Sequence, residues 1–161
     1  MKKFLMTLVF CCAALAVYAD MDLRVQNFSG VTGGTAKVVS TGWKNYGLQL
    51  TADQKSDLRI TYNQLFTFYP GKVYKLSADI SGNGVPFAEL RVLDIDNRPL
   101  KQAVIPMQVK IHKGELKAFA DLRKIKFEEM PRRFQVIIGV KKGTSLLVED
   151  VEFEIDNDLD D

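Results

Sequence analysis

The residues that could carry out catalysis are too scattered along this sequence to predict an active site. His112 is the only imidazole, and it stands between Lys110 and Lys113 with no acid or nucleophile nearby to complete a triad in sequence order. Asp94 and Asp96 precede a proline, where turn chemistry accounts for both carboxylates. The sequence therefore predicts a protein that is not an enzyme. A small hydrolase would require His112 to meet an acid and a hydroxyl group in one pocket.

The chain's single tryptophan suggests a different chemistry. Trp43 lies in GWKNYG, before the run Tyr46 to Leu50, and therefore in a loop rather than at an alternating inward position. An indole offers a large flat surface on which the C–H faces of a sugar ring can stack. Two interpretations are open, a platform for a sugar and packing within the core or the loop. Tyr46 is expected to point inward together with Leu48 and Leu50.

A second candidate groove combines aromatic, amide and guanidinium side chains. Tyr62 and Tyr69 lie near Arg59 and Asn63, and planar donors and amides suit sugar hydroxyls. Gln49, on the face opposite Leu48 and Leu50, belongs to the same set of candidate ligand-binding residues. The alternative is that these side chains form an ordinary solvent-facing strand surface.

Short runs rich in Val, Ile, Tyr and Phe recur between Gly, Asn, Asp and Pro, which is typical of an all-β protein. Nine or ten such strands predict an antiparallel β-sandwich of two sheets. The segment 115–127 also fits a helical stripe, and we expect a strand there with helix as the alternative. The expected strands are 23–28, 36–40, 47–51, 58–68, 73–80, 87–95, 100–105, 116–122, 134–140 and 145–155.

Alternation within two of these strands shows which side is buried. Tyr74, Leu76 and the residues at the same spacing in 73–80 share one face, and polar residues occupy the other. The last strand changes phase near Glu149-Asp150, because the apolar positions before and after it have opposite parity. A β-bulge at that point is the expected cause.

The opening segment resembles an export signal. Lys2 and Lys3 precede an apolar run, and small residues lead to a cleavage site before Asp20, so we expect residues 1–19 to be a cleaved signal peptide of bacterial type. A retained signal anchor is the alternative. The mature domain would then be 20–156, secreted or periplasmic, without a membrane span, and followed by an acidic disordered tail, 157–161. Both cysteines fall within the signal, so the domain must fold without disulfides.

Charge limits the class of partner. Removal of Lys2 and Lys3 leaves 20 basic and 20 acidic residues, a balance that argues against nucleic acid. The stretch 101–142 nevertheless carries eleven Lys or Arg against four acids, whereas 149–161 carries eight acids and no base. The basic stretch is either a solvated face or a surface for an anionic ligand.

The run FYPGKVYKLSADISG carries a family resemblance. Pro70-Gly71-Lys72, followed by Tyr74, Leu76 and Ser77, resembles the central signature of the family 4/9-type carbohydrate-binding modules, within the galactose-binding-like jelly rolls. Asn27-Phe28, the strand 46–50 and the closing strand 147–153 follow in the order of that family. Locally, Pro70 and Gly71 are suited to a tight turn between two strands. Most matched positions are turn or core residues, which determine a fold rather than a ligand.

The resemblance implies a jelly roll that binds a glycan without catalysis, often beside an enzyme, with a structural calcium ion near the chain ends. Asp150 is the candidate calcium ligand, together with backbone carbonyls. Ser29 stands where the family often has an acid, and we expect no enzyme domain beside the module. We therefore expect a carbohydrate as partner. The alternative is a structural or protein-interaction sandwich, whose basic face meets a protein or a cell-surface polymer.

Overall fold

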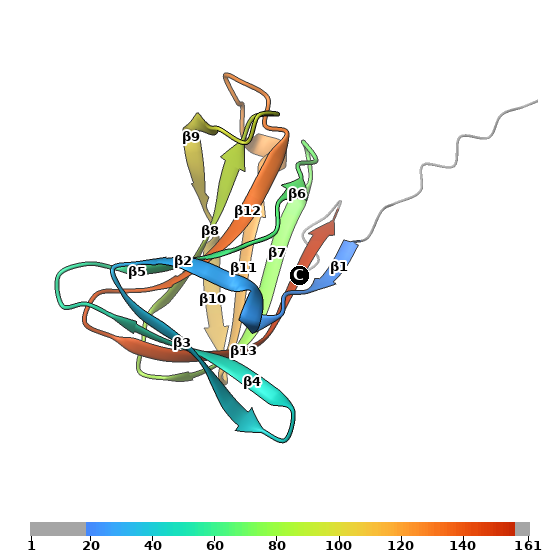
Figure 1. Ribbon diagram of the computed structural model, residues 1–161. Helices are drawn as coiled ribbons and strands as arrows, with labels where there is room; N and C mark the ends of the chain where they lie inside the picture. The colour runs from blue at the N-terminus through green and yellow to red at the C-terminus, as the bar shows by residue number, and fades with distance from the viewer. Residues whose placement is uncertain (1–18, 157–161) are drawn as a thin grey trace, which may run out of the picture.

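Period-two burial along the strands leaves one apolar face on each of two antiparallel sheets, and these two faces pack together (Figure 1). The computed structural model describes residues 19–156, which form thirteen strands and two short 3-10 helices. The predicted all-β sandwich is confirmed. The signal peptide and the acidic tail predicted from the sequence lie outside the described residues, apart from Ala19.

The first sheet, hereafter the seven-stranded sheet, contains the chain's last strand in its middle. Across the sheet the order is β10 (Gln108–His112), β11 (Glu115–Asp121), β7 (Val73–Gly82), β13 (Ser145–Asp156), β4 (Asn45–Ala52) and β3 (Gly34–Gly42). The first strand, β1 (Ala19–Asp22), also pairs with β13. Most of these pairings join segments far apart in sequence.

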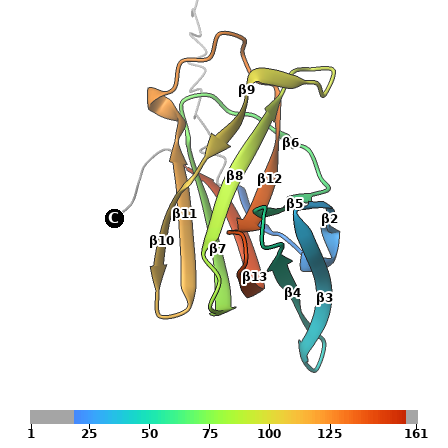
Figure 2. The ribbon, with the colours of Figure 1, turned by 90° about the vertical axis from the view of Figure 1, so that its left-hand side faces the viewer.

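The second sheet, hereafter the six-stranded sheet, is centred on β12. Its order is β2 (Phe28–Thr32), β5 (Leu58–Tyr62), β12 (Arg133–Val140), β8 (Pro86–Leu93) and β9 (Pro99–Pro106), with β6 (Phe66–Thr67) also paired to β12. Two views at right angles show the β3–β4 hairpin projecting beyond the packed sheets (Figures 1 and 2).

Aromatic rings from both sheets meet in the core. The ring of Tyr74 on β7 lies edge-on to Phe134 on β12, with centroids 5.0 Å apart, and Phe134 lies 5.5 Å from Phe153 on β13. All three side chains are fully buried, as predicted for Tyr74. Such pairs contribute about 0.5–1.5 kcal/mol each beyond the area that they bury.

Two of the predicted strands are interrupted. The segment 23–28 is not a strand but contains η1 (Val25–Asn27), a 3-10 turn in which the backbone N–H of Asn27 donates to the carbonyl of Arg24 at 2.9 Å. Buried residues at positions 25 and 28 fit the three-residue repeat of this helix. The segment 58–68 divides into β5 and β6, because polar residues 63–64 leave the sheet between them.

The ambiguous segment 115–127 is a strand followed by a short turn of helix. β11 pairs with β7 on one side and with β10 on the other, so backbone pairing overrides the helix-favouring composition. A 3-10 helix, η2 (Leu122–Lys124), follows. The prediction missed β10, and His112 is the last residue of this strand.

The bulge predicted near Glu149-Asp150 is confirmed. The pairing of β13 with β7 shifts register between Glu149 and Glu152, and Asp150 has φ 45°. The turn at Pro70-Gly71 is also present, with Gly71 at φ 69°. Among the described residues, no helix is long and apolar enough to span a membrane.

Candidate functional site

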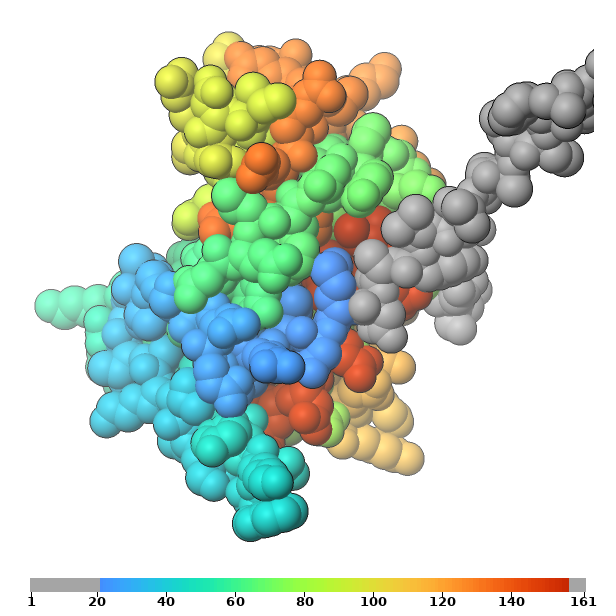
Figure 3. Space-filling model, turned by 45° about the vertical axis from the view of Figure 1, so that its right-hand side comes forward, coloured from blue at the N-terminus to red at the C-terminus, as the bar shows by residue number. Residues whose placement is uncertain are grey.

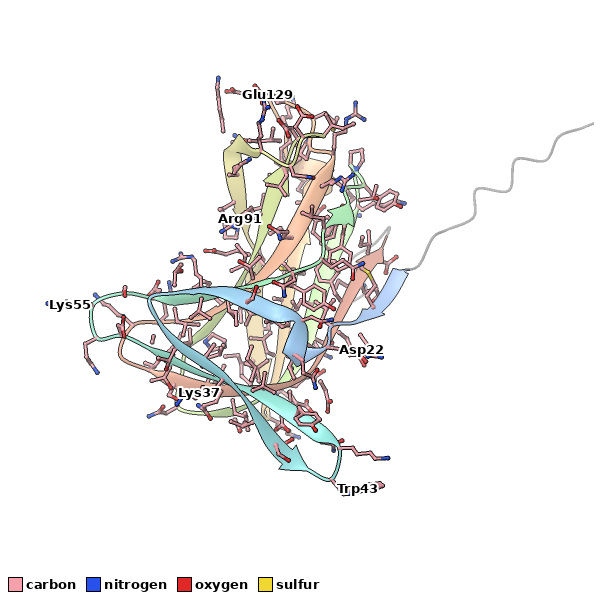
Figure 4. All side chains as sticks on the ribbon, in the orientation of Figure 1. Asp22, Lys37, Trp43, Lys55, Arg91 and Glu129 are labelled. Atoms are coloured by element: carbon pink, nitrogen blue, oxygen red, sulfur yellow. The ribbon has the colours of Figure 1, made fainter. Side chains whose placement is uncertain are left out.

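The β3–β4 hairpin carries the most exposed aromatic ring among the described residues. Gly42 pairs with Asn45, so Trp43 and Lys44 alone form the tip, and Lys44 adopts the left-handed φ of 64° that this tight turn requires. Trp43 is 86% exposed. Figure 4 shows it at the end of the hairpin, pointing away from the sheets. Of the two interpretations of Trp43, the structure therefore excludes packing within the core.

Lys44 lies against the indole. Its Nζ atom is 4.4 Å from the centroid of the Trp43 ring, a distance at which a cation is attracted to an aromatic face. The exposed surface of the indole remains large enough to accept a flat ligand.

A pocket of about 430 Å³ adjoins the turn end of this hairpin, where β4 begins. We call it the hairpin pocket. Three segments form it: the chain from β1 into η1, the start of β4 and the bulge of β13, which meet on the face drawn in Figure 3. Its lining residues are Asp22, Leu23, Arg24, Val25, Gln26, Asn27, Lys44, Asn45, Tyr46, Glu149, Asp150 and Val151.

The local structure explains why this pocket exists. The backbone N–H of Leu23 donates to the carbonyl of Val151 at 2.8 Å, which holds the first segment against β13. The 3-10 turn η1 then leads the chain away from the sheet, and the bulge turns Asp150 outward. The pocket is therefore bounded by two irregular segments and a hairpin, not by a regular strand surface.

Sequence analysis wrongly placed Tyr46 inside the core. It has the parity of Leu48 and Leu50, which are buried, but Tyr46 itself is 48% exposed. The reason is that β4 begins beyond the end of the core, so the inward face of the hairpin has no opposite sheet at that position (Figure 1). Its proximity to the turn was the only sequence signal for exposure.

The polar groups of the hairpin pocket suit a ligand rich in hydroxyl groups. Amides come from Gln26, Asn27 and Asn45, which offer both donors and acceptors. The cations Arg24 and Lys44 stand beside three carboxylates, from β1 and the bulge, so the lining carries charges of both signs. A mixed lining of this kind favours a neutral polar ligand over one of strong single charge.

Calcium binding by Asp150 stays a prediction. Within residues 19–156 no group of three or more His, Cys, Asp and Glu side chains is placed to hold a metal ion. Calcium takes six to eight oxygen ligands, usually with several carboxylates among them. The described side chains around Asp150 do not fit that requirement, and no role is assigned to calcium.

The remaining predicted residues do not gather at this pocket. Tyr62 is wrong as a groove residue, because it is 3% exposed and its ring packs between Phe28 and Phe66 in the core. Tyr69 is 41% exposed but lies at the turn before Pro70. The two tyrosines predicted to share one groove therefore lie in different surroundings, Tyr62 in the core and Tyr69 at the surface.

Gln49 and Asn63 are both engaged in hydrogen bonds. The side-chain amide of Gln49 lies on the outer face of the seven-stranded sheet and donates to Ser145 Oγ at 2.8 Å and to the Leu146 carbonyl at 3.3 Å. Asn63 follows β5, and its carbonyl oxygen accepts from the hydroxyl of Ser29. These bonds order the two side chains but do not bring them near Trp43.

Arg59 lies on the outer face of the six-stranded sheet. Its Nε atom donates to Glu89 Oε2 at 3.0 Å, and its guanidinium lies 5.1 Å from the centroid of Phe87. The hydrogen bond to Glu89 raises the pKa of Arg59 above its usual value. Arg59 is therefore an ordered, paired cation on a surface distinct from the hairpin pocket.

His112 is exposed at the end of β10, where it pairs in register with Glu115. It does not line the hairpin pocket, and among the described lining residues there is no histidine, serine or cysteine. The pocket thus does not bring His112 together with an acid and a hydroxyl group.

Comparisons with known proteins find similarity in structure but none in sequence. No family model matches the chain, and no curated protein matches its sequence. The structure is similar to the CBM22-1 xylan-binding domain of Xyn10C from Paenibacillus barcinonensis, with a TM-score of 0.50 and 10% identity over 88% of this chain and 95% of that domain.

Two longer structures contain a similar domain. One is the CBM22-1–GH10 part of xylanase 10B from Clostridium thermocellum, with a TM-score of 0.50 and 12% identity over 86% of this chain and 28% of that one. The other is the enzymatically active domain of tailspike protein 4 of bacteriophage CBA120, with a TM-score of 0.50 and 13% identity over 83% of this chain. Our chain spans 20% of that tailspike domain. At these identities the likeness shows a shared β-sandwich fold, which carbohydrate-binding modules also adopt.

Proposed function

We propose that this chain binds a glycan, without catalysing a reaction on it, through Trp43 and the hairpin pocket. The observation that carries the proposal is the 86% exposure of the only tryptophan, on a hairpin whose turn end adjoins a polar pocket. An exposed indole costs solvation free energy, and stacking on a sugar face recovers it.

The pocket supplies what the indole lacks. Stacking has little directional preference, whereas amides and charged groups at fixed positions select particular hydroxyl geometries. Tyr46 provides a second aromatic surface, half-exposed at the pocket wall. A sugar stacked on Trp43 could therefore extend toward Asn45 and Asn27.

The fold and the sequence resemblance support the same class of function. The xylan-binding domain named above shares the sandwich over nearly its whole length. The Pro70-Gly71-Lys72 turn leading to Tyr74 resembles the family 4/9-type modules specifically. With the signal-like segment 1–19, the proposal places the glycan outside the cytoplasm, with the protein secreted or periplasmic.

The proposal is tested by affinity electrophoresis of the purified protein on gels containing xylan, mixed-linkage β-glucan or mannan. We expect retardation by at least one polysaccharide. Trp43→Ala should weaken that binding about tenfold or more, because aromatic anchors contribute about 2 kcal/mol or more at binding sites. Trp43→Phe should retain part of the affinity.

The matched control is Ile95→Ala, a substitution of another strongly exposed apolar side chain, 70% exposed and remote in sequence from the hairpin. It should leave migration unchanged. Binding that survives Trp43→Ala would move the site away from the hairpin. No retardation by any polysaccharide would reject glycan binding and favour a protein-interaction role.

A further inference from the structure

The outer face of the six-stranded sheet carries an excess of arginine. Register brings four rows of side chains across β5, β12 and β8. The rows are Arg59, Gly139 and Phe87; Thr61, Ile137 and Glu89; Gln135 and Arg91; and Arg133 and Leu93. Glu89 is the only acid in these rows, against three arginines.

Two of these arginines have no counter-ion. Arg59 pairs with Glu89 at 3.0 Å, whereas Arg91 and Arg133 make no ion pair within the part of the chain that the structure describes. Arg91 is half-buried, and Figure 4 shows it on β8, far from Trp43 at the hairpin tip. A half-buried guanidinium without an acid keeps its binding capacity for an external anion.

The two free guanidinium groups lie close enough to act on one ligand. Gln135 faces Arg91 directly, and Arg133 is two residues along the same strand, so Arg91 and Arg133 are diagonal neighbours. Such diagonal pairs are about 7–8 Å apart between backbone positions. Gln135 between them donates to the Tyr62 carbonyl at 3.4 Å, which keeps its amide near the sheet.

The surface beneath is ordered. Ile137 is 1% exposed although it points away from the core, because the Arg59–Glu89 pair joins the strands on either side of β12. Gly139 leaves room for the Phe87 ring, on which both Arg59 and Lys141 lie. The strands that carry Arg91 and Arg133 are therefore held together on this face.

The outer face of the seven-stranded sheet carries a cluster of acids beside the lysines Lys75, Lys110 and Lys117. On the outer face of the seven-stranded sheet, Glu149, Asp79 and Glu115 are direct neighbours across three strands. A polyanion would be repelled there and attracted to the arginine face. Several basic side chains of the stretch 101–142 form ion pairs with acids, such as Arg123 with Asp121 and Lys141 with Asp57.

A protein partner fits this face less well than a polysaccharide. β8 and β12 are paired on both sides, so neither offers a free backbone edge to an added strand. Val104, beside Arg91 in register, is the only large exposed apolar side chain in this part of the described face. Protein interfaces need buried apolar anchors, whereas a chain of acidic sugars needs fixed cations and polar groups.

We propose that the face formed by Arg91, Gln135 and Arg133 is a second binding surface, which takes the carboxylate groups of a uronate-containing polysaccharide. The planar guanidinium fork matches a carboxylate with two parallel hydrogen bonds. This surface is separate from the hairpin pocket, and it gives the protein two sites for different parts of a glycan mixture or of one branched chain.

The test titrates the protein with polygalacturonate and with its fully methyl-esterified form, which has the same backbone without charge. We expect binding to polygalacturonate alone, weakened at high salt. The variant Arg91→Gln/Arg133→Gln should lose at least tenfold in affinity. The variant Arg91→Lys/Arg133→Lys should lose less, because it retains charge without the fork. Lys37→Gln/Lys55→Gln removes the same charge from exposed positions elsewhere and should have little effect.

Several results would overturn the proposal. These are equal affinity of the Arg→Gln variant and wild type, an equal loss with Lys37→Gln/Lys55→Gln, and self-association of wild type that the Arg→Gln variant abolishes. Quenching of Trp43 fluorescence by polygalacturonate would place the ligand at the hairpin instead. Arginine-dependent binding of polygalacturonate without any neutral glycan binding would reject the function proposed for Trp43 and leave this surface standing.

Discussion

Gly139 shows how one missing side chain organises a surface. A Cβ atom at this position would lie 2.1 Å from Phe87 Cζ and 2.5 Å from the backbone oxygen of Leu58. The space is filled by the Phe87 ring, which in turn supports Arg59. Glycine is therefore required here by close packing, not by an unusual backbone conformation.

Gly139→Ala should lower the free energy of unfolding by about 1–3 kcal/mol, because the Phe87 ring and β5 must both shift. Urea denaturation followed by circular dichroism measures the change. Gly42→Ala is the matched control, since its Cβ would meet only Asn45 atoms at 3.8 Å, and it should change stability by less than about 0.5 kcal/mol. Equal effects of the two substitutions would contradict this packing.

Single residues are also where sequence analysis was least reliable. Tyr46 and Tyr62 both have inward parity on their strands, but one is half-exposed and the other is buried. Parity tells which face a side chain belongs to, and only the extent of the opposite sheet tells whether that face is covered at a given position. No local sequence pattern shows how far the opposite sheet extends over a given strand.

At the scale of elements, the turn at Pro70-Gly71 is held by a buried hydroxyl group. Tyr74 Oη accepts a hydrogen bond from the Tyr69 N–H at 2.7 Å and donates to the Tyr69 carbonyl at 3.1 Å. Burial raises the pKa of Tyr74, so the hydroxyl remains protonated as a donor. Tyr74, which belongs to the family-like run, thus holds the turn at Pro70-Gly71 through its hydroxyl group.

Tyr74→Phe should destabilise the protein by about 1–3 kcal/mol, since both backbone groups of Tyr69 lose a partner. Tyr62→Phe removes a hydroxyl whose hydrogen bond within the described residues is long, 3.4 Å from Asn27 Nδ2, and should cost less than about 1 kcal/mol. Thermal unfolding of the two variants measures which substitution costs more stability. A larger loss for Tyr62→Phe would show that the turn does not depend on Tyr74.

Asp121 ends β11 and begins η2. Its carboxylate accepts hydrogen bonds from the Arg123 side chain and backbone N–H, which lowers its pKa to about 2. Because the folded pKa is depressed, the stabilisation is present above the unfolded pKa of about 4 and is lost as the pH falls through about 2.

We therefore expect Asp121→Asn to unfold at lower urea concentration than wild type at neutral pH, and the two midpoints to converge in acid. Denaturation curves at several values between neutral pH and about pH 2 test this linkage. A difference in midpoint that persists unchanged at the acid end would assign the role of Asp121 to geometry and not to charge.

Elements were largely predictable where alternation was regular. The strands corresponding to β7 and β12 follow from it directly, and the β13 bulge follows from its change of phase. The alternation pattern did not predict the 3-10 helix η1 or the strand β10, because each is short and lies beside polar residues. Segment 115–121 is a strand only through its partners β7 and β10, which no local window reveals.

At the scale of the whole molecule, alternation predicts two sheets but not which strands adjoin. β13 lies between β7 and β4, which are distant from it in sequence, and β12 lies between β5 and β8. The hairpin pocket depends on this arrangement, because β13 brings its bulge to the start of β4. The sequence therefore indicated Trp43 as a candidate but not the polar groups beside it.

The arrangement also places an arginine cluster and an acidic cluster on different outer faces of a chain whose predicted mature form has no net charge. Overall charge balance thus conceals local clusters of each sign. Steering of a polymer depends on the local field and not on the sum. The two proposed sites are separated on this basis, a polar pocket at the hairpin and an arginine face on the six-stranded sheet.

Fluorescence of the single tryptophan tests the central proposal most directly, because all indole emission from the predicted mature protein comes from Trp43. In free protein the emission should have the red-shifted maximum of a solvent-exposed indole. Titration with a polysaccharide that retards the protein should shift the maximum to shorter wavelength and saturate with the affinity measured by calorimetry. Saturable heat of binding with no change in emission would contradict a glycan site at the hairpin.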